Sequence, residues 1–202
     1  MGVLLDDVMR TYELQEGGRL RRILVCLLAP GVQAVVVFRF GQWVHLQPKF
    51  LRMFLKPIYL VMNGIIQIMW GIEIQHSANI GSGLYIGHFG GITISGDAII
   101  GKCCNLSQNV TIGVSGQGEK RGVPIIGDNV YIAPGARLFG KISIGNNVKI
   151  GANAVIYKDI PDNAVVVLYP GFKIISYKGN RNTEVINEHQ IPIKRVSLKK
   201  DN

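Results

Sequence analysis

Histidine is the side chain best suited to moving a proton near neutral pH, because its unperturbed pKa is about 6.5. The chain contains four histidines: His45, His76, His88 and His189. The first lies in a helical stretch and the last in a polar tail, so both are expected at the surface. The other two lie in a repetitive central region, and only His88 falls at a break in the repeat, among glycines. Because small neighbours leave open space around an imidazole, His88 is the candidate general base.

The central region repeats every six residues. Ile or Leu occupies thirteen positions at this spacing: Ile74, Ile80, Ile86, Ile94, Ile100, Leu106, Ile112, Ile126, Ile132, Leu138, Ile144, Ile150 and Ile156. A period of six is a multiple of two but not of 3.6, so it fits short strands joined by turns and does not fit a helix. The pattern predicts a β-solenoid, whose coils stack about 4.8 Å apart around the Ile ladder.

Two insertions interrupt the repeat. The step from Ile86 to Ile94 is eight residues, which adds two residues around His88, and the step from Ile112 to Ile126 is fourteen, which adds eight within residues 114–124. Solenoids place insertions in loops, often on the binding face. We therefore expect the chemistry at these two breaks.

The segments on either side lack the six-residue period. Residues 1–70 contain apolar runs separated by Gly17-Gly18 and Pro30-Gly31, which predict helices that cap the first coil. The stretch 42–56 is mixed and 59–70 is apolar, so no run reaches the 18 to 20 apolar residues of a membrane span. Basic residues among the apolar ones leave contact with an anionic membrane surface as an alternative. The solenoid domain is expected over 71–177, and 178–202 is expected to be a basic, flexible tail.

Composition narrows the functional classes. With 202 residues, 48% of them hydrophobic and 17% charged, the chain can bury a core, and its formal charge is +9. That charge suits nucleic acid, an anionic membrane or an anionic substrate, but the aromatic residues do not interleave with the basic ones as a nucleic-acid platform requires. Three cysteines without metal-ligand spacing indicate reduced packing residues. No signal peptide is visible, because Asp6 and Asp7 precede the first long apolar run, so a cytoplasmic location is expected.

Several motifs together resemble serine acetyltransferase. They are GLYIGHFGGITI at 83–94, QNVTIG at 108–113, PIIGDNVYI at 124–132, GNNVKIGA at 145–152, and PGVQA at 30–34 with FRFGQW at 38–43. The resemblance covers about residues 30–177. It implies a mainly β fold, namely a left-handed parallel β-helix with three hexapeptides per coil and an α-helical N-terminal cap, assembled as a homotrimer.

The resemblance also implies a reaction and a set of site residues. The reaction is direct acetyl transfer from acetyl-CoA to a hydroxyl group, without a metal. His88 matches the family's general base, and Glu73 matches the acidic residue that holds the imidazole. Arg121 and Gln108 would bind the acceptor, and backbone N–H groups around Gly135 would stabilise the oxyanion. The CoA groove would comprise Ala133, Pro134, Gly135, Lys149 and Ala152.

Departures from the family pattern leave the acceptor open. Gly87 stands where the family usually has Asp directly before the catalytic His. Gly122 and Val123 stand where it has an Arg-His pair, with Arg121 one place away. Losing these groups leaves the transfer chemistry intact but puts the acceptor in doubt. Both L-serine and a sugar hydroxyl of an exopolysaccharide precursor therefore remain candidates.

Two alternatives lie outside acetyl transfer. One is a metal enzyme on the same solenoid, similar to the γ-class carbonic anhydrases, which need three histidines for zinc, whereas the coils here contain two. The other is a solenoid scaffold without catalysis, in which His88 would have no chemical role.

Overall fold

The structure is a computed structural model that describes residues 2–168. Residues Met1–Leu168 group into one compact unit. The end of the predicted solenoid domain, 169–177, and the predicted basic tail, 178–202, lie outside the described residues.

Four helices form the N-terminal region: α1 (Gly2–Leu14), α2 (Arg19–Leu28), α3 (Pro30–His45) and α4 (Lys49–Trp70). Pro30 occupies the first turn of α3, where its missing N–H costs no hydrogen bond. Helix α4 runs through Pro57 without interruption and ends at Trp70, and its C-cap residue Gly71 adopts a left-handed conformation with φ of 60°. Glycine is favoured there because a Cβ would be strained. The helices expected before the solenoid are confirmed.

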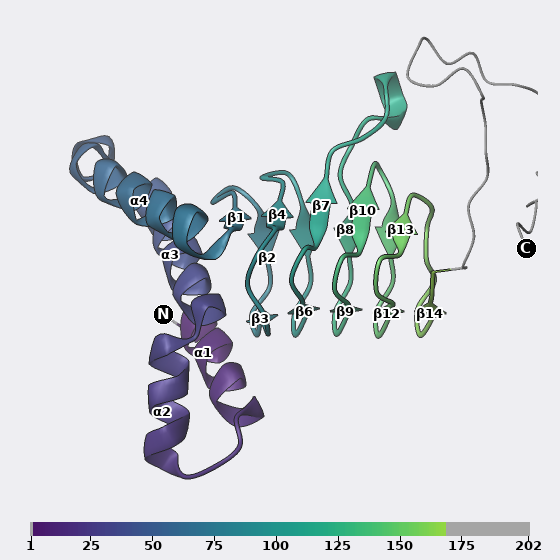
Figure 1. Cartoon of the computed structure of the whole chain (residues 1–202). Coiled ribbons are helices and arrows are strands. Elements are labelled where there is room, and N and C mark those ends of the chain that lie inside the picture. The colour runs from purple at the N-terminus through teal and green to yellow at the C-terminus, as the bar shows by residue number, and fades with distance from the viewer. Residues whose placement is uncertain (1, 169–202) are drawn as a thin grey trace, which may run out of the picture. The chain divides into compact units, whose positions relative to one another are not determined.

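The remaining described chain forms a three-sided parallel β-helix (Figure 1). Sheet A contains β1 (Ile72–Ile74), β4 (Ile92–Ile94), β7 (Thr111–Gly113), β10 (Arg137–Phe139) and β13 (Val155–Ile156). Sheet B contains β2 (Asn79–Ile80), β5 (Ile99–Ile100), β8 (Ile125–Ile126) and β11 (Ser143–Ile144). Sheet C contains β3 (Tyr85–Ile86), β6 (Asn105–Leu106), β9 (Tyr131–Ile132), β12 (Lys149–Ile150) and β14 (Val165–Val166). Up to β13, successive strands of the chain enter sheets A, B and C in turn, so each coil has three sides. In the last coil a single bridge of Ile160 to Ile144 takes the place of a sheet-B strand before β14.

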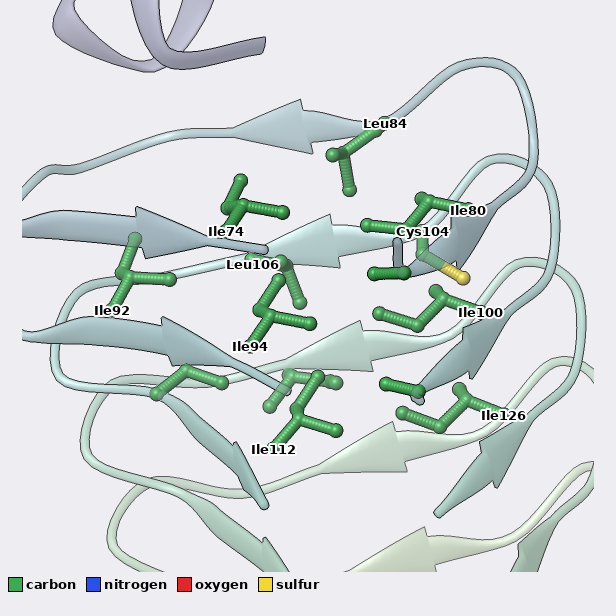
Figure 2. Packing of buried hydrophobic residues seen from close by; sticks show 14 of the residues in the cluster. Ile74, Ile80, Leu84, Ile92, Ile94, Ile100, Cys104, Leu106, Ile112 and Ile126 are labelled. Atoms are coloured by element: carbon green, nitrogen blue, oxygen red, sulfur yellow. The ribbon is translucent and has the colours of Figure 1, made fainter. Parts of the chain in front are cut away.

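The predicted Ile/Leu ladder fills the axis of this β-helix. All thirteen positions are buried, and none is more than 6% exposed. Parallel pairing stacks equivalent residues in register, as with Ile74 on Ile94 and Ile94 on Ile112 in sheet A. Figure 2 shows these side chains, with Ile80, Ile100 and Ile126 of sheet B facing them. Burying each such side chain stabilises the fold by about 1.5–3 kcal/mol, so the ladder is the core.

Polar side chains of α1 and α3 cover the open end of the first coil. The Arg39 guanidinium donates to the carbonyl oxygens of Ile80 at 2.8 Å and Gly81 at 2.7 Å. Its Nε atom forms a buried ion pair with Asp7 at 2.9 Å, and the other carboxylate oxygen of Asp7 accepts the Leu84 N–H at 2.8 Å. These contacts satisfy backbone groups that an uncapped strand edge would leave without partners. The predicted capping role of the helices is confirmed.

Helix α4 corrects one expectation. An 18-residue window of this 22-residue helix has a mean hydropathy of 1.3, so α4 is the one unbroken helix in residues 2–168 whose length and composition would allow it to cross a membrane. Helices α2 and α3 pass the same test only together, as a pair bent by 61°. Only 11% of the residues in the 18-residue stretch of α4 are buried in the protein. The sequence pattern missed this because Lys56 and Pro57 divide the helix into two shorter runs.

Candidate active site

His88 lies on an exposed loop between β3 and β4, at the edge where sheet C meets sheet A. Gly90 and Gly91 shape this loop, with φ values of +102° and +65° that other residues rarely adopt. The Phe89 ring meets the Trp70 ring edge-on, with centroids 5.2 Å apart. The two-residue insertion therefore forms a tight turn that rests against the last residue of α4 and presents an imidazole to solvent.

The same edge carries most of the other predicted site residues. Backbone hydrogen bonds join one coil to the next along it: Asn109 N–H to Gly90 O at 2.7 Å, Gly135 N–H to Gln108 O at 3.0 Å, and Asn153 N–H to Pro134 O at 2.9 Å. Each coil adds about 4.8 Å. The structure therefore aligns His88, Gln108, Pro134 and Ala152 along one edge, over about 14 Å.

Gln108 carries an unsatisfied polar atom on this edge. Its Oε1 is buried and has no hydrogen-bond partner within residues 2–168. A buried acceptor left unpaired costs free energy, so a donor supplied by a ligand would be favoured there. The position, one coil below His88, suits a hydroxyl or ammonium group of an acceptor.

The backbone N–H groups around Gly135 are hydrogen-bonded within the chain. The Gly135 N–H already donates to Gln108, the Ala133 N–H donates to Ile150 O at 2.9 Å, and the Ala136 N–H donates to Ala133 O at 3.3 Å. Pro134 has no N–H. These donors take part in coil-to-coil and turn hydrogen bonds within the chain, and the expectation that this segment stabilises an oxyanion stays a prediction.

Lys149 and Ala152 form the lower part of the edge. Lys149 lies on the outer face of β12, and its Nζ is 5.9 Å from the centre of the Tyr131 ring, which lies directly above it on β9. Both Lys149 and Ala152 are exposed. A cation beside a small residue leaves room for an extended anionic ligand along the edge, which is compatible with the predicted CoA phosphates.

Glu73 belongs to β1, the first strand of sheet A, and not to the His88 loop. It occupies the middle of β1, where it pairs with Thr93 of β4, and it borders a pocket of about 360 Å³ with Lys56, His45 and His76. No hydrogen bond or ion pair joins its carboxylate to His88 among the described residues. In that pocket the His45 and His76 rings stack at 3.6 Å, and burial, with His45 and Lys56 nearby, lowers the pKa of His76.

Arg121 lies at a different edge of the three-sided β-helix from His88. Its loop leaves β7 of sheet A and enters β8 of sheet B, and it projects from the coils in Figure 1. Ser115 and Gly122 close the base of the loop through two backbone hydrogen bonds of 3.0 Å, and a short 3-10 helix, Gly118–Lys120, forms its tip. Arg121 is exposed. Within one chain, therefore, the width of sheet A separates Arg121 from the His88 edge.

Three residues of this region were missing from the sequence-based candidates. Trp70 supports the His88 loop through Phe89, the Asn109 N–H donates to Gly90 of the loop from the next coil, and the Tyr131 ring, on the preceding coil, lies beside the Lys149 ammonium group. Only Asn109 had a recognisable signal, since an Asn at a solenoid corner is typical of positive φ, and its φ is 58°.

Comparison with known proteins agrees with this architecture. Residues 124–158 match the family model described as bacterial transferase hexapeptide (six repeats). A serine acetyltransferase of Staphylococcus aureus is 33% identical over 190 residues, which cover 93% of this chain and 84% of that protein. The chain therefore belongs to the serine acetyltransferase family of hexapeptide-repeat acyltransferases.

Further relatives of this family are similar but longer. A serine acetyltransferase of Synechococcus elongatus is 33% identical over 168 residues, which cover 83% of this chain and 66% of that protein. The crystal structure of Entamoeba histolytica serine acetyltransferase 1 with L-cysteine matches with a TM-score of 0.65 and 30% identity, over 83% of this chain and 62% of that one. The Neisseria gonorrhoeae enzyme in complex with serine matches with a TM-score of 0.70 and 28% identity, over 84% and 66%. This chain thus spans less than two thirds of the length of several relatives.

Proposed function

We propose that this protein transfers an acetyl group from acetyl-CoA to a hydroxyl group of a small acceptor, with His88 as general base. The observation that carries the proposal is the single edge that aligns an exposed His88 with Gln108, the 133–135 segment and Ala152. Family membership supplies the reaction class. An edge of this length accommodates an acceptor near the imidazole and an extended donor along the lower coils.

In the proposed mechanism the His88 imidazole takes the proton of the acceptor hydroxyl. The alkoxide oxygen attacks the thioester carbonyl carbon and forms a C–O bond. When the intermediate collapses, the C–S bond breaks and the imidazolium returns the proton to the CoA thiolate. The free Gln108 Oε1 would accept a hydrogen bond from the acceptor, and Lys149 would meet a CoA phosphate. No redox step or additional reactant is required.

L-Serine is the first candidate acceptor. The relatives that cover most of this chain are named serine acetyltransferases, and one solved relative is described in complex with serine. A hydroxymethyl group beside His88, with the ammonium group near Gln108 Oε1, would use the unsatisfied atom on this edge.

A sugar hydroxyl is the second candidate, and the residues beside the site favour it. Gly87 precedes His88 and Gly122-Val123 precede Pro124, so neither position offers a charged side chain to an amino or carboxylate group. A site built to pair charged groups rejects ligands without them, and the reverse also holds. An uncharged polyol would lose nothing from these replacements.

A homotrimer is the assembly we propose. Because sheet A separates the Arg121 loop from the His88 edge within one chain, Arg121 would reach an acceptor only at the edge of a neighbouring subunit. Threefold packing of prisms through their faces brings such edges together. Mixing inactive His88→Ala protein with inactive Arg121→Ala protein should then restore part of the activity. In mixed trimers some interfaces pair an intact His88 from one subunit with an intact Arg121 from its neighbour.

The experiment that tests the function is release of the CoA thiol from acetyl-CoA, with L-serine or a panel of sugars and nucleotide sugars as acceptor. His88→Ala should lower kcat by about 10²–10⁴-fold. Lys102→Ala, which changes an exposed residue at a different edge, should leave it unchanged. Serine-driven release identifies an amino-acid acetyltransferase and sugar-driven release a glycan-modifying one. Equal activity of His88→Ala and wild type would refute the base assignment.

A further inference from the structure

One whole face of α4 is apolar and exposed to solvent. Its side chains follow the three- and four-residue spacing of a single helical face, and each is between 52% and 86% exposed: Phe50, Phe54, Ile58, Val61, Ile65 and Ile68. Contiguous apolar surface of this kind is rare on soluble proteins and marks a binding surface. The α4 apolar face, defined by these six residues, therefore needs a partner.

The opposite side of α4 packs against the rest of the protein. Tyr59 and Ile66 are buried, at 3% and 6% exposure, and polar residues follow a separate narrow stripe, with Lys49, Lys56 and Asn63 spaced seven residues apart. Because one side of the helix packs on the protein along its length, only the opposite side is available to a partner. The helix can therefore lie along a surface but is not free to be surrounded by lipid.

An apolar groove extends the α4 apolar face towards α2. It has a volume of about 440 Å³ and its walls come from all four helices, with Val8 on α1, Leu27 on α2, Val36 on α3 and Met62 on α4. Beyond it, Leu20, Leu24 and Leu28 of α2 are 58–79% exposed. The partner surface thus spans two helices, which favours a broad apolar medium over a single inserted side chain.

The charges around this surface indicate which partner it fits. Residues 17–72 contain seven Lys or Arg residues and no Asp or Glu. Arg39 is used in the ion pair with Asp7, which leaves six cations: Arg19, Arg21, Arg22, Lys49, Arg52 and Lys56. A twofold contact between two copies would place the same cations opposite each other without any acidic partner from this region. Anionic lipid headgroups would instead attract every one of them.

We propose that the α4 apolar face, together with the exposed leucines of α2, docks on the surface of an anionic lipid bilayer. Helix α4 lies in the interface with Phe54, Val61 and Ile68 among the acyl chains, while the cations at the starts of α2 and α4 meet the headgroups. The proposal is independent of the acceptor and of the reaction, because it rests on residues outside the His88 edge.

Sedimentation of the full-length protein with lipid vesicles tests the proposal. The vesicles are pure phosphatidylcholine or phosphatidylcholine in which about a third of the lipid is phosphatidylglycerol. Binding is expected to the anionic vesicles, to weaken in high salt because the charges are screened, and to be weak on the neutral vesicles. No binding to the anionic vesicles at low salt would overturn the proposal.

Two sets of substitutions separate the apolar and the charged contributions. Phe54→Ser, Val61→Ser and Ile68→Ser together should lower the partition coefficient at least about tenfold, and these side chains are 56–86% exposed, so the fold should persist. Arg19→Gln, Arg21→Gln and Lys49→Gln together should lower it about a hundredfold on anionic vesicles. The matched control, Val3→Ser, Leu5→Ser and Leu14→Ser, removes three exposed apolar residues of α1 and should bind like wild type.

Two results would contradict the membrane partner. If the serine triple variant binds vesicles as tightly as wild type, the α4 apolar face is not the docking surface. If light scattering instead shows that the wild type self-associates, that the serine triple variant abolishes this association, and that neither protein binds vesicles, a second copy of the chain covers the face.

Discussion

Replacing Arg39 with Met should destabilise the protein more than any surface substitution, because Arg39 links the helical cap to the first coil. The side chain is 9% exposed and its partner Asp7 is 1% exposed. Arg39→Met keeps most of the apolar stem but removes the donors to Ile80 O, Gly81 O and the Asp7 carboxylate. The substitution therefore leaves a buried negative charge and two strand-edge carbonyl groups without partners.

The magnitude follows from these losses. Breaking a buried ion pair by removing one partner costs about 3–5 kcal/mol. The unpaired carbonyl oxygens would add about 1 kcal/mol or more each if water could not reach them, but at the end of a solenoid water can replace part of the lost bonds. We therefore expect a loss of about 4 kcal/mol in the free energy of unfolding. For a chain of this size that corresponds to a fall in Tm of roughly 10 °C.

Denaturant unfolding followed by circular dichroism measures the loss. Arg137→Met is the matched control, since Arg137 is exposed and donates one hydrogen bond of 3.0 Å to Thr111, and it should cost less than about 1 kcal/mol. Amide exchange adds a local readout, because the Leu84 N–H donates to Asp7 at 2.8 Å and should lose protection in Arg39→Met.

A second substitution tests the physical reason. Adding Asp7→Asn to Arg39→Met removes the uncompensated charge while keeping an oxygen for the Leu84 N–H, so the double variant should recover about 1–2 kcal/mol. The reasoning would be refuted if Arg39→Met costs no more than Arg137→Met. It would also be refuted if the double variant is less stable than Arg39→Met alone.

Two further predictions concern the site and the core. Gly91→Ala should lower kcat about ten- to a hundredfold, because its Cβ would lie 2.2 Å from Asn109 Oδ1 at a φ of +65°. The control Gly64→Ala, whose Cβ would meet nothing within 4 Å, should leave kcat unchanged, as steady-state kinetics would show. Burial raises the pKa of the Cys104 thiol to about 11, so in Cys103→Ser protein this thiol should resist alkylation at about pH 8 until the chain unfolds, as mass spectrometry would show. Rapid labelling of the native protein would mean that Cys104 is not buried.

The core was predictable from the sequence because its signal is periodic. Every sixth residue is apolar, and a strand places alternate residues on opposite faces, so the thirteen positions could point to one axis only in a solenoid. For the N-terminal cap, the sequence predicted that helices would form but not which side chains would contact the first coil. That Arg39 and Asp7 would meet depends on how α1 and α3 cross over the first coil, and no spacing in the sequence encodes a contact between residues 32 positions apart.

Part of the site could be predicted from the position that each residue occupies within the repeat. His88, Gln108, Pro134 and Ala152 each stand two residues after a buried Ile or Leu of sheet C, with spacings of 20, 26 and 18 residues. These spacings equal one coil of 18 residues plus the insertions of two and eight, so their common edge could have been derived before the structure was known. The environment of Glu73 could not, because its pocket is formed by side chains of α3 and α4.

The positions of the two insertions explain why one chain does not complete the predicted site. The first insertion follows a strand of sheet C and the second follows a strand of sheet A, so the two loops leave the β-helix at different edges. Coils that stack in register hold each edge straight, and the flat face between two edges does not bend to bring them together. An acceptor that contacts both His88 and Arg121 must therefore lie between two subunits. In the homotrimer that we propose, catalysis would depend on assembly as well as on the imidazole. Mixing His88→Ala with Arg121→Ala therefore tests the proposed site more stringently than either variant alone.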